Sequence, residues 1–305
     1  KASAVPTWVH KIDITSEEDT PNGFTFNNDG TKMFVIGHKE DEVIEYTLST
    51  AWNVSTYSLV DSFSTKSESG YSRDVKFSQD GTKMFVLGGS DSGADDGLDS
   101  VCEYTLSTGF DVSSTVTFID CFSVADQEDE PDDLEFSPDG TKMFVIGCEA
   151  ASDDKSYINE YTLSTAWDVS TASFVDNFSV HSEETQAKGL AFTYDGTKMF
   201  VTGTTGDDVN EYTLSTGFDV STASFVDSYD ISSQENFPTS LAFSSDGSKL
   251  FVLGRSDDEV NEYTLSCSYG VVNCKDPTSS KDDVASVESQ TESAKQLIQH
   301  TTYPV

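Results

Sequence analysis

The sequence has few basic residues and no long apolar run. Each of these features argues against one class of partner. Only 17 of the 305 residues are Lys or Arg, against 54 Asp or Glu, which gives a formal net charge of −37. Such a chain repels polyanions, so we expect no nucleic-acid partner. No stretch of about 20 apolar residues occurs, so we also expect no direct membrane insertion. Solubility in saline water is an alternative reason for the charge.

Familiar catalytic and metal-binding motifs are also absent. The sequence has no G-x-S-x-G, no H-E-x-x-H and no phosphate-binding loop, and its four His are scattered. No C-x-x-C occurs, which argues against a zinc site. We therefore expect a protein that is not an enzyme. A hydrolase remains the alternative, because a catalytic pair of carboxylates could be hidden among so many acids.

The five cysteines predict two disulfides. Cys102 and Cys121 fall on two strands that we expect to be neighbours, and Cys267 and Cys274 bracket a short Ser-Tyr-Gly-Val-Val-Asn segment. Cys148 is left over. Two disulfides would imply an oxidising compartment, and buried free thiols are the alternative.

What the sequence does contain is a fivefold repeat. The heptapeptide Asp-Gly-Thr-Lys-Met-Phe-Val occupies residues 29–35 and returns three times, with a fifth copy that reads Asp-Gly-Ser-Lys-Leu-Phe-Val; the later copies occupy 80–86, 139–145, 195–201 and 246–252. Around each copy lie four short runs rich in aromatic and β-branched residues, separated by turn residues. Four antiparallel strands repeated in this way predict the blades of a β-propeller.

We therefore predict an all-β protein, a five-bladed β-propeller over residues 1–274. The expected repeats are about 8–64, 65–123, 124–179, 180–230 and 231–274. The fifth repeat stops after its third strand, whereas the segment that begins at Trp8 aligns with the fourth strand of repeat four at Phe225. We expect this N-terminal strand to complete the last blade and so to cover its open edge.

Two recurring features have an expected structural role. The Gly of each Asp-Gly-Thr-Lys turn should take the left-handed conformation that closes a bulged hairpin. A Glu before Tyr in each third strand should pair with the recurring Lys of the turn. The glutamates are Glu45, Glu103, Glu160, Glu211 and Glu262.

The repeat resembles a known family. The unit F-S-x-D-G-T-K-M-F-V-x-G, followed by V-x-E-Y-T-L-S-T-A-W-D-V-S-T, looks like the repeats of the YVTN and lactonase-like β-propeller superfamily over residues 8–266. Tandem copies of this kind are similar to those in secreted or surface proteins of marine bacteria and phages. The resemblance implies the propeller fold, but the superfamily includes binders, scaffolds and enzymes.

Residues 275–305 differ in composition from the repeats. A polar linker precedes Val284, Val287, Thr291, Ala294 and Ile298, whose spacing of three and four predicts a helix. These residues would form one apolar face of the helix, which could mediate self-association through 284–301. Alternatively, the helix could pack on the propeller or fray. The tail is similar to segments that link surface domains to an anchor.

The acidic loops predict a calcium site. Roughly half of the 54 acidic residues fall in loops that should share one face of the propeller. Calcium binds six to eight oxygens and would relieve the repulsion among them. The candidate ligands are Asp74, Asp132, Asp133, Asp95 and Asp96. A solvated acidic rim is the alternative.

One aromatic residue recurs in the turn between the third and fourth strands of a repeat. Its copies are Trp52, Phe110, Trp167 and Phe218. Such a ring of aromatic faces could stack on sugars, or each ring could cap the core of its own blade.

Together these patterns favour an extracellular or cell-surface binding or adhesion module. It would use an acidic loop face, with or without calcium, to bind a protein or glycan on a cell surface, and its tail would serve anchoring or assembly. The alternatives are a structural subunit of a surface layer, filament or phage fibre, and a secreted propeller hydrolase or lactonase.

Overall fold

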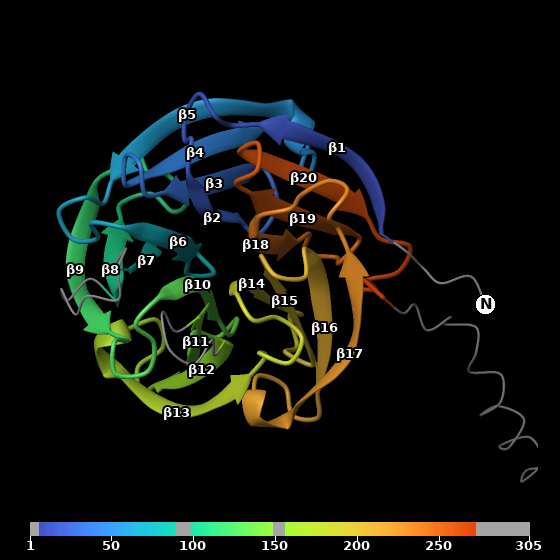
Figure 1. Ribbon diagram of the computed structural model, residues 1–305. Helices are drawn as coiled ribbons and strands as arrows, with labels where there is room; N and C mark the ends of the chain where they lie inside the picture. The colour runs from blue at the N-terminus through green and yellow to red at the C-terminus, as the bar shows by residue number, and fades with distance from the viewer. Residues whose placement is uncertain (1–5, 90–98, 149–155, 273–305) are drawn as a thin grey trace, which may run out of the picture.

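A computed structural model describes residues 6–89, 99–148 and 156–272. Within them, five four-stranded antiparallel sheets surround a central axis, which confirms the predicted five-bladed propeller (Figure 1). Among the described residues no helix is long and apolar enough to cross a membrane. The predicted helix at 284–301 lies outside them.

Each blade contains four strands in the order inner, second, third and outer. Blade 1 has β2 (Pro21–Phe26), β3 (Lys32–Gly37), β4 (Glu42–Leu48) and β5 (Tyr57–Ser64). Blade 2 has β6 (Ser72–Phe77), β7 (Lys83–Gly88), β8 (Ser100–Leu106) and β9 (Val116–Ser123). Blade 3 has β10 (Pro131–Phe136), β11 (Lys142–Cys148), β12 (Ser156–Leu163) and β13 (Ala172–Ser179). Blade 4 has β14 (Ala187–Phe192), β15 (Lys198–Gly203), β16 (Asp208–Leu214) and β17 (Ala223–Asp230). Blade 5 has β18 (Pro238–Phe243), β19 (Lys249–Gly254), β20 (Glu259–Thr264) and β1 (Thr7–Asp13).

The last blade is closed by the start of the chain, as predicted. β1 pairs antiparallel with β20, and Figure 1 shows the two strands side by side although they are far apart in sequence. Trp8 Nε1 donates a hydrogen bond of 3.0 Å to Asn261 Oδ1, and Lys11 Nζ lies 2.6 Å from Glu259 Oε2. Ile12 enters the core between blades 5 and 1. The ring therefore has no blade with a missing outer strand.

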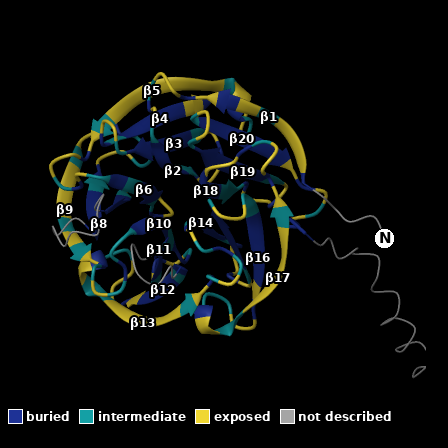
Figure 2. Ribbon diagram, in the orientation of Figure 1, coloured by how far each residue is buried: buried dark blue, intermediate teal, exposed yellow. Residues whose placement is uncertain are grey.

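The hydrophobic core lies between neighbouring blades. One core cluster joins Phe251 and Val260 of blade 5 to Phe24 and Met33 of blade 1, and four similar clusters fill the other interfaces. Figure 2 shows the consequence: the outer strands are largely exposed, whereas the strands nearer the axis are buried. Each blade therefore buries apolar residues against both of its neighbours, and closure of the ring extends this burial to the interface between blades 5 and 1.

The two faces of the propeller carry different connections. The turn face holds the Asp-Gly-Thr-Lys turns and the turns between third and outer strands, three of which contain short 3₁₀ helices. These are η1 (Val54–Thr56), η2 (Val169–Thr171) and η3 (Val220–Thr222). The loop face, on the opposite side, holds the acidic loops. Inner strands run from the loop face to the turn face, so both of their ends open onto the central channel.

The glycines of the turns adopt the predicted conformation. Gly30 has φ of 69°, and its four equivalents have φ between 67° and 71°. A second reason excludes a side chain, because a Cβ at Gly30 would lie 2.2 Å from the Trp52 ring. The turn glycine and the recurring aromatic residue therefore form one packed unit.

One predicted disulfide is confirmed. Cys102 and Cys121 are directly opposite each other on β8 and β9, with Cα atoms 4.0 Å apart, and they are bonded. Cys267 is also disulfide-bonded, and its predicted partner Cys274 lies outside the described residues. Cys148 is a half-buried free thiol.

Candidate functional site

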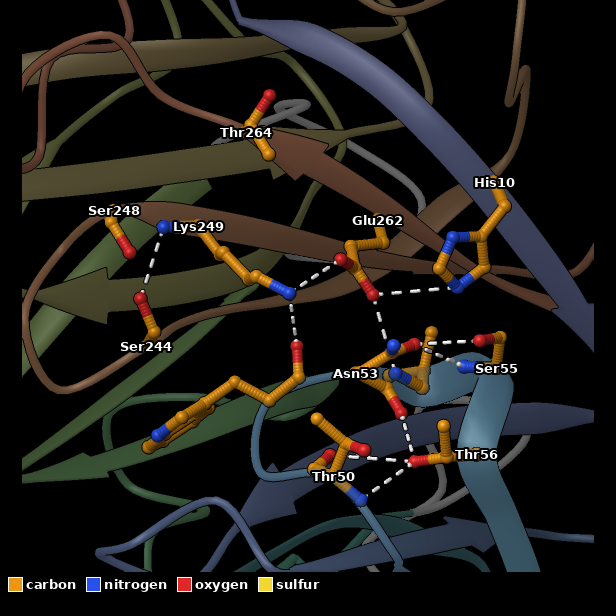
Figure 3. A network of polar contacts seen from close by, with 12 residues as sticks. His10, Thr50, Asn53, Ser55, Thr56, Ser244, Ser248, Lys249, Glu262 and Thr264 are labelled. Carbon is orange, nitrogen blue, oxygen red and sulfur yellow. Dashed lines mark hydrogen bonds and ion pairs between the residues drawn. The ribbon is translucent and has the colours of Figure 1, made fainter.

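The recurring Lys and Glu form a clamp between neighbouring blades. In blade 5, Lys249 Nζ lies 2.6 Å from Glu262 Oε1 and donates a 2.5 Å hydrogen bond to the Trp52 carbonyl oxygen of blade 1. Glu262 Oε2 accepts a hydrogen bond of 3.2 Å from the Val54 N–H. Figure 3 shows Glu262 between Lys249 and His10, whose Nε2 lies 3.4 Å from Glu262 Oε2. The predicted ion pair is confirmed, and it also holds the next blade.

All five interfaces carry this clamp. The Lys–Glu distances lie between 2.6 and 2.7 Å throughout. The glutamates are buried, at 1–3% exposure, which indicates a structural role for them. In each case the acceptor for the Lys is the carbonyl of the recurring aromatic residue in the following blade.

The aromatic residues of the turns are half-buried at the blade interfaces. Trp52 packs against Phe26 of its own blade and Phe251 of the preceding blade, with ring centroids 5.2 and 6.4 Å away. Phe110, Trp167 and Phe218 make the equivalent contacts. Sequence reasoning missed the fifth member, Tyr269, because a cysteine-containing turn replaces the repeat there. All five have φ between 52° and 61°, which marks the shared turn conformation.

The symmetry of the repeats is broken inside the central channel. Three channel-lining positions on each inner strand differ from blade to blade. At the loop-face end they are Asn22, Arg73, Asp132, Lys188 and Thr239. In the middle they are Gly23, Asp74, Asp133, Gly189 and Ser240. At the turn-face end they are Thr25, Lys76, Glu135, Ala191 and Ala242. Because catalysis and binding need different groups that converge on one point, these positions form the candidate site.

A buried ionic cluster occupies the middle of the channel. Lys76 Nζ lies 3.0 Å from Asp74 Oδ2, 3.5 Å from Asp133 Oδ1 and 3.3 Å from Glu135 Oε1. Asp74 also accepts the Leu134 N–H at 3.1 Å. Contacts run across the channel, since Asp133 of blade 3 accepts a hydrogen bond of 3.0 Å from Ser240 Oγ of blade 5. Three carboxyl groups thus share one ammonium group.

Burial raises the pKa of all three carboxyl groups of this cluster. Burial, followed by the charge of Asp74, raises the pKa of Asp133 well above its usual range. Burial likewise raises the pKa of Asp74, against the opposing charge of Lys76. Burial also raises the pKa of Glu135 to about 7, against the opposing effect of Lys76. Glu135 is therefore a carboxyl group that changes charge near neutrality.

Replacing Glu135 by Gln should remove part of the pH dependence of stability. The folded pKa of about 7 exceeds the ordinary value of 4.5, so the folded state binds more protons between these values. Stability from this group is present at low pH and lost as pH rises toward 7. Chemical denaturation should show E135Q gaining about 2 kcal/mol over the parent between pH 5 and 8. If the free energy of unfolding had the same pH dependence in E135Q and in the parent, the raised pKa of Glu135 would be contradicted.

The turn-face mouth of the channel is hollowed over the ends of the inner strands. Two adjoining hollows of 230 and 470 Å³ share six lining residues: Thr25, Phe26, Asn28, Gln79, Glu135 and Tyr194. Phenylalanines from the ends of the inner strands, including Phe77 and Phe136, line the walls. The Tyr194 ring stands at the rim and is 68% exposed. The mouth combines aromatic walls, amide groups and one carboxyl group at its base.

The loop-face mouth is smaller and charged. Its hollow of 60 Å³ is lined by three cationic residues, Arg73, Lys188 and Arg255, together with Asp132, Asn22, Thr239 and Phe237. Asp132 lies between two of the cations, with Oδ2 2.8 Å from Lys188 Nζ and Oδ1 3.4 Å from Arg73 Nη1.

The predicted calcium ligands lie in these ionic contacts. Asp74 and Asp133 face Lys76, and Asp132 faces Arg73 and Lys188, so lysine and arginine side chains are their countercharges in this structure. Asp95 and Asp96 lie outside the described residues. Among the described residues, no group of three His, Cys, Asp or Glu side chains is arranged to hold a metal ion.

Part of the acidic loop face also has a structural role. Four glutamates of the loops that precede inner strands are at most 1% exposed: Glu18, Glu128, Glu184 and Glu235. Each accepts a backbone N–H two residues later, as in the 2.9 Å bond from Thr20 to Glu18. Burial raises the pKa of Glu18. Their recurrence at one position in four repeats was the signal in the sequence, and it was hidden by the many exposed acids around them.

Comparison with known proteins yields general likenesses among propellers. No protein-family model and no curated protein matches the sequence. The Pseudomonas aeruginosa periplasmic gluconolactonase is 16% identical over 83% of this chain and 68% of its own, with a TM-score of 0.46. A luciferin-regenerating enzyme is 13% identical over 88% and 99%, with a TM-score of 0.49.

Two further solved structures are similar to this chain at a comparable level. The β-propeller domain of Myceliophteria thermophila Cps50 (Swd1) is 10% identical over 86% of this chain and 100% of its own, with a TM-score of 0.46. A Desulfotomaculum acetoxidans protein of unknown function is 14% identical with a TM-score of 0.44, and the match covers 77% of this chain but only 62% of that chain. At these identities and TM-scores the likenesses carry no argument about activity.

Proposed function

We propose that the protein is an exported carbohydrate-binding module that holds a sugar ring at the turn-face mouth. The observation that carries the proposal is the concave aromatic mouth with Glu135 at its base. The larger hollow, at 470 Å³, falls within the roughly 300–1,000 Å³ range typical of ligand pockets. The disulfide between Cys102 and Cys121 supports an oxidising compartment and so favours export.

The chemistry of the mouth suits a sugar. Aromatic rings such as Tyr194 and Phe77 offer apolar faces to the C–H groups of a pyranose. The amides of Asn28 and Gln79 and the carboxyl group of Glu135 offer hydrogen-bond donors and acceptors for hydroxyl groups. Lys76 offsets the charge of Glu135, so the base of the mouth favours a neutral ligand. The net charge of −37 further disfavours acidic glycans.

The proposed sugar-binding surface lies elsewhere than the aromatic ring predicted from the sequence. The predicted aromatic ring at Trp52, Phe110, Trp167 and Phe218 packs mainly between blades, and Trp52, Phe110 and Trp167 contribute to the mouth from its sides. The binding surface we propose is formed chiefly by the ends of the inner strands and by Tyr194.

The repeats themselves supply a mild test variant. Tyr194 occupies a turn position that is Ser245 in blade 5, so Tyr194→Ser should leave the fold unchanged. A neutral glycan identified on an array should bind Y194S about tenfold more weakly in calorimetric titration, since a stacked ring contributes up to about 1.5 kcal/mol. Leu59→Ser, at a 52% exposed site on an outer strand, is the control.

Two outcomes would overturn the proposal: no neutral glycan binds, or Y194S binds the glycan as tightly as the parent. The same titration in the presence of a chelator tests whether glycan binding requires calcium, as the sequence suggested. Unchanged affinity would reject a calcium requirement.

A hydrolase is the second candidate, favoured by Glu135 alone. Its pKa of about 7 suits general acid or base catalysis near neutral pH, and its side chain is 23% exposed. Release of reducing sugar from the bound glycan, abolished in Glu135→Gln, would establish hydrolysis. Binding without turnover by the parent would leave the binding module as the whole function.

A further inference from the structure

Cationic side chains converge on the loop-face mouth of a strongly acidic protein. Both arginines of the chain, Arg73 and Arg255, line the hollow there, and Lys188 is the third cation. Only 17 basic residues occur in the sequence, and five of them are used in the clamps between blades. Three more basic residues at one opening are a large share of the remaining positive charge, so their placement there needs a physical reason.

Two of the cations already bind a carboxylate. Lys188 and Arg73 lie on either side of Asp132, at 2.8 and 3.4 Å. The side chain of Arg73 is also placed over the Tyr71 ring, 4.5 Å from its centroid. Asp132 thus shows that this opening is arranged to hold a carboxylate between a lysine and an arginine.

The third cation is held by neutral groups. Arg255 donates to the Pro21 carbonyl at 3.4 Å and to the side chain of Asn22, and it lies 3.2 Å from His38 Nδ1. Across residues 6–89, 99–148 and 156–272, Arg255 forms no ion pair. These contacts orient the guanidinium group without neutralising it.

Among the residues that line the hollow, positive charges outnumber negative charges, which favours an added anion. Three cations and one carboxylate, Asp132, line the hollow. Three further carboxyl groups lie within electrostatic range of these cations but do not line the hollow: Glu130 near Lys188, and Glu18 and Asp258 near Arg255. Burial, and then the charge of Arg73, lowers the pKa of Arg255, as expected for a cation that faces another cation. The 60 Å³ hollow has room for a group of only a few atoms.

We infer that the loop-face mouth is a binding site for a small oxyanion group, a carboxylate or a phosphate, held by Arg255 together with Arg73 and Lys188. The planar fork of an arginine suits both groups. The site is separate from the turn-face mouth, and the buried cluster around Lys76 lies between them. The proposal does not depend on carbohydrate binding.

The test measures thermal stability against increasing acetate, inorganic phosphate or chloride at constant ionic strength. We expect acetate or phosphate to raise Tm saturably, because an anion that binds only the folded state stabilises it. Arg255→Gln should shift the half-saturating concentration at least tenfold upward. Lys39→Gln, which removes the same charge from a half-exposed position on the same face, should leave it unchanged.

The acetate and phosphate arms show which group the site prefers. If R255Q does not fold, Arg73→Gln is used in the same titration, since Lys188 remains to pair with Asp132. Equal responses to acetate, phosphate and chloride would overturn the inference. So would a response that R255Q retains in full, or one that K39Q loses to the same extent.

Discussion

A variant that lacks residues 1–13 should lose most of its stability and self-associate. Deletion of β1 leaves β20 as an exposed edge, which is a template for pairing with another chain. It also removes Ile12 from the core and removes the Trp8–Asn261 hydrogen bond. At about 1 kcal/mol for each lost hydrogen bond, the free energy of unfolding should fall by several kcal/mol. Urea denaturation and light scattering measure both effects.

A peptide supplied in trans is the control for this deletion. The sequence Thr-Trp-Val-His-Lys-Ile-Asp, which corresponds to β1, should restore stability and the oligomeric state of the parent, whereas a scrambled peptide should not. A truncated chain that unfolds like the parent and keeps the parent's oligomeric state would show that the ring does not depend on β1.

Replacing a clamp lysine should cost about 4 kcal/mol, because it leaves a buried carboxylate without its counterion. In Lys142→Met, Glu160 keeps only the 3.0 Å hydrogen bond from the Val220 N–H. Adding Glu160→Gln removes the uncompensated charge and should recover at least half of the loss. Denaturation curves of the single and double variants measure the difference.

Lys66→Met is the control for charge removal, since Lys66 is exposed. It should change stability by less than about 0.5 kcal/mol. If K142M were as mild as K66M, or if E160Q gave no recovery, the clamp would not contribute to the stability of the blade interface as stated.

The fold could be predicted because its determinants recur. Five copies of the Asp-Gly-Thr-Lys turn set the number of blades, and the alignment of the Trp8 segment with an outer strand gave the closure. The pairing of the recurring Glu and Lys was also correct. Its second function, the hydrogen bonds to Val54 and its equivalents in the next blade, was not predicted, because the sequence does not show which turn the ion pair faces.

The site could not be predicted in the same way, because it consists of the positions at which the repeats differ. Lys76 and Glu135 occupy one position of two inner strands, where other blades have Thr or Ala. A comparison of the five copies position by position would have found this signal. Three of the acids at these positions, Asp74, Asp132 and Asp133, were predicted as calcium ligands, but their pairing with basic side chains was not predicted. The structural role of buried loop acids such as Glu18 was also not predicted. That Arg73 and Arg255 line the same opening could not be predicted, because they belong to different blades and come together only in the closed ring.

The central claim, that the turn-face mouth binds a sugar, is tested most directly by hydrogen exchange with and without the glycan. We predict slower exchange in the inner hairpins that line the mouth, around Asn28, Gln79, Pro138, Tyr194 and Ser245. The loop face should be unchanged. Protection confined to the acidic loops, with no change in the inner hairpins, would contradict the claim.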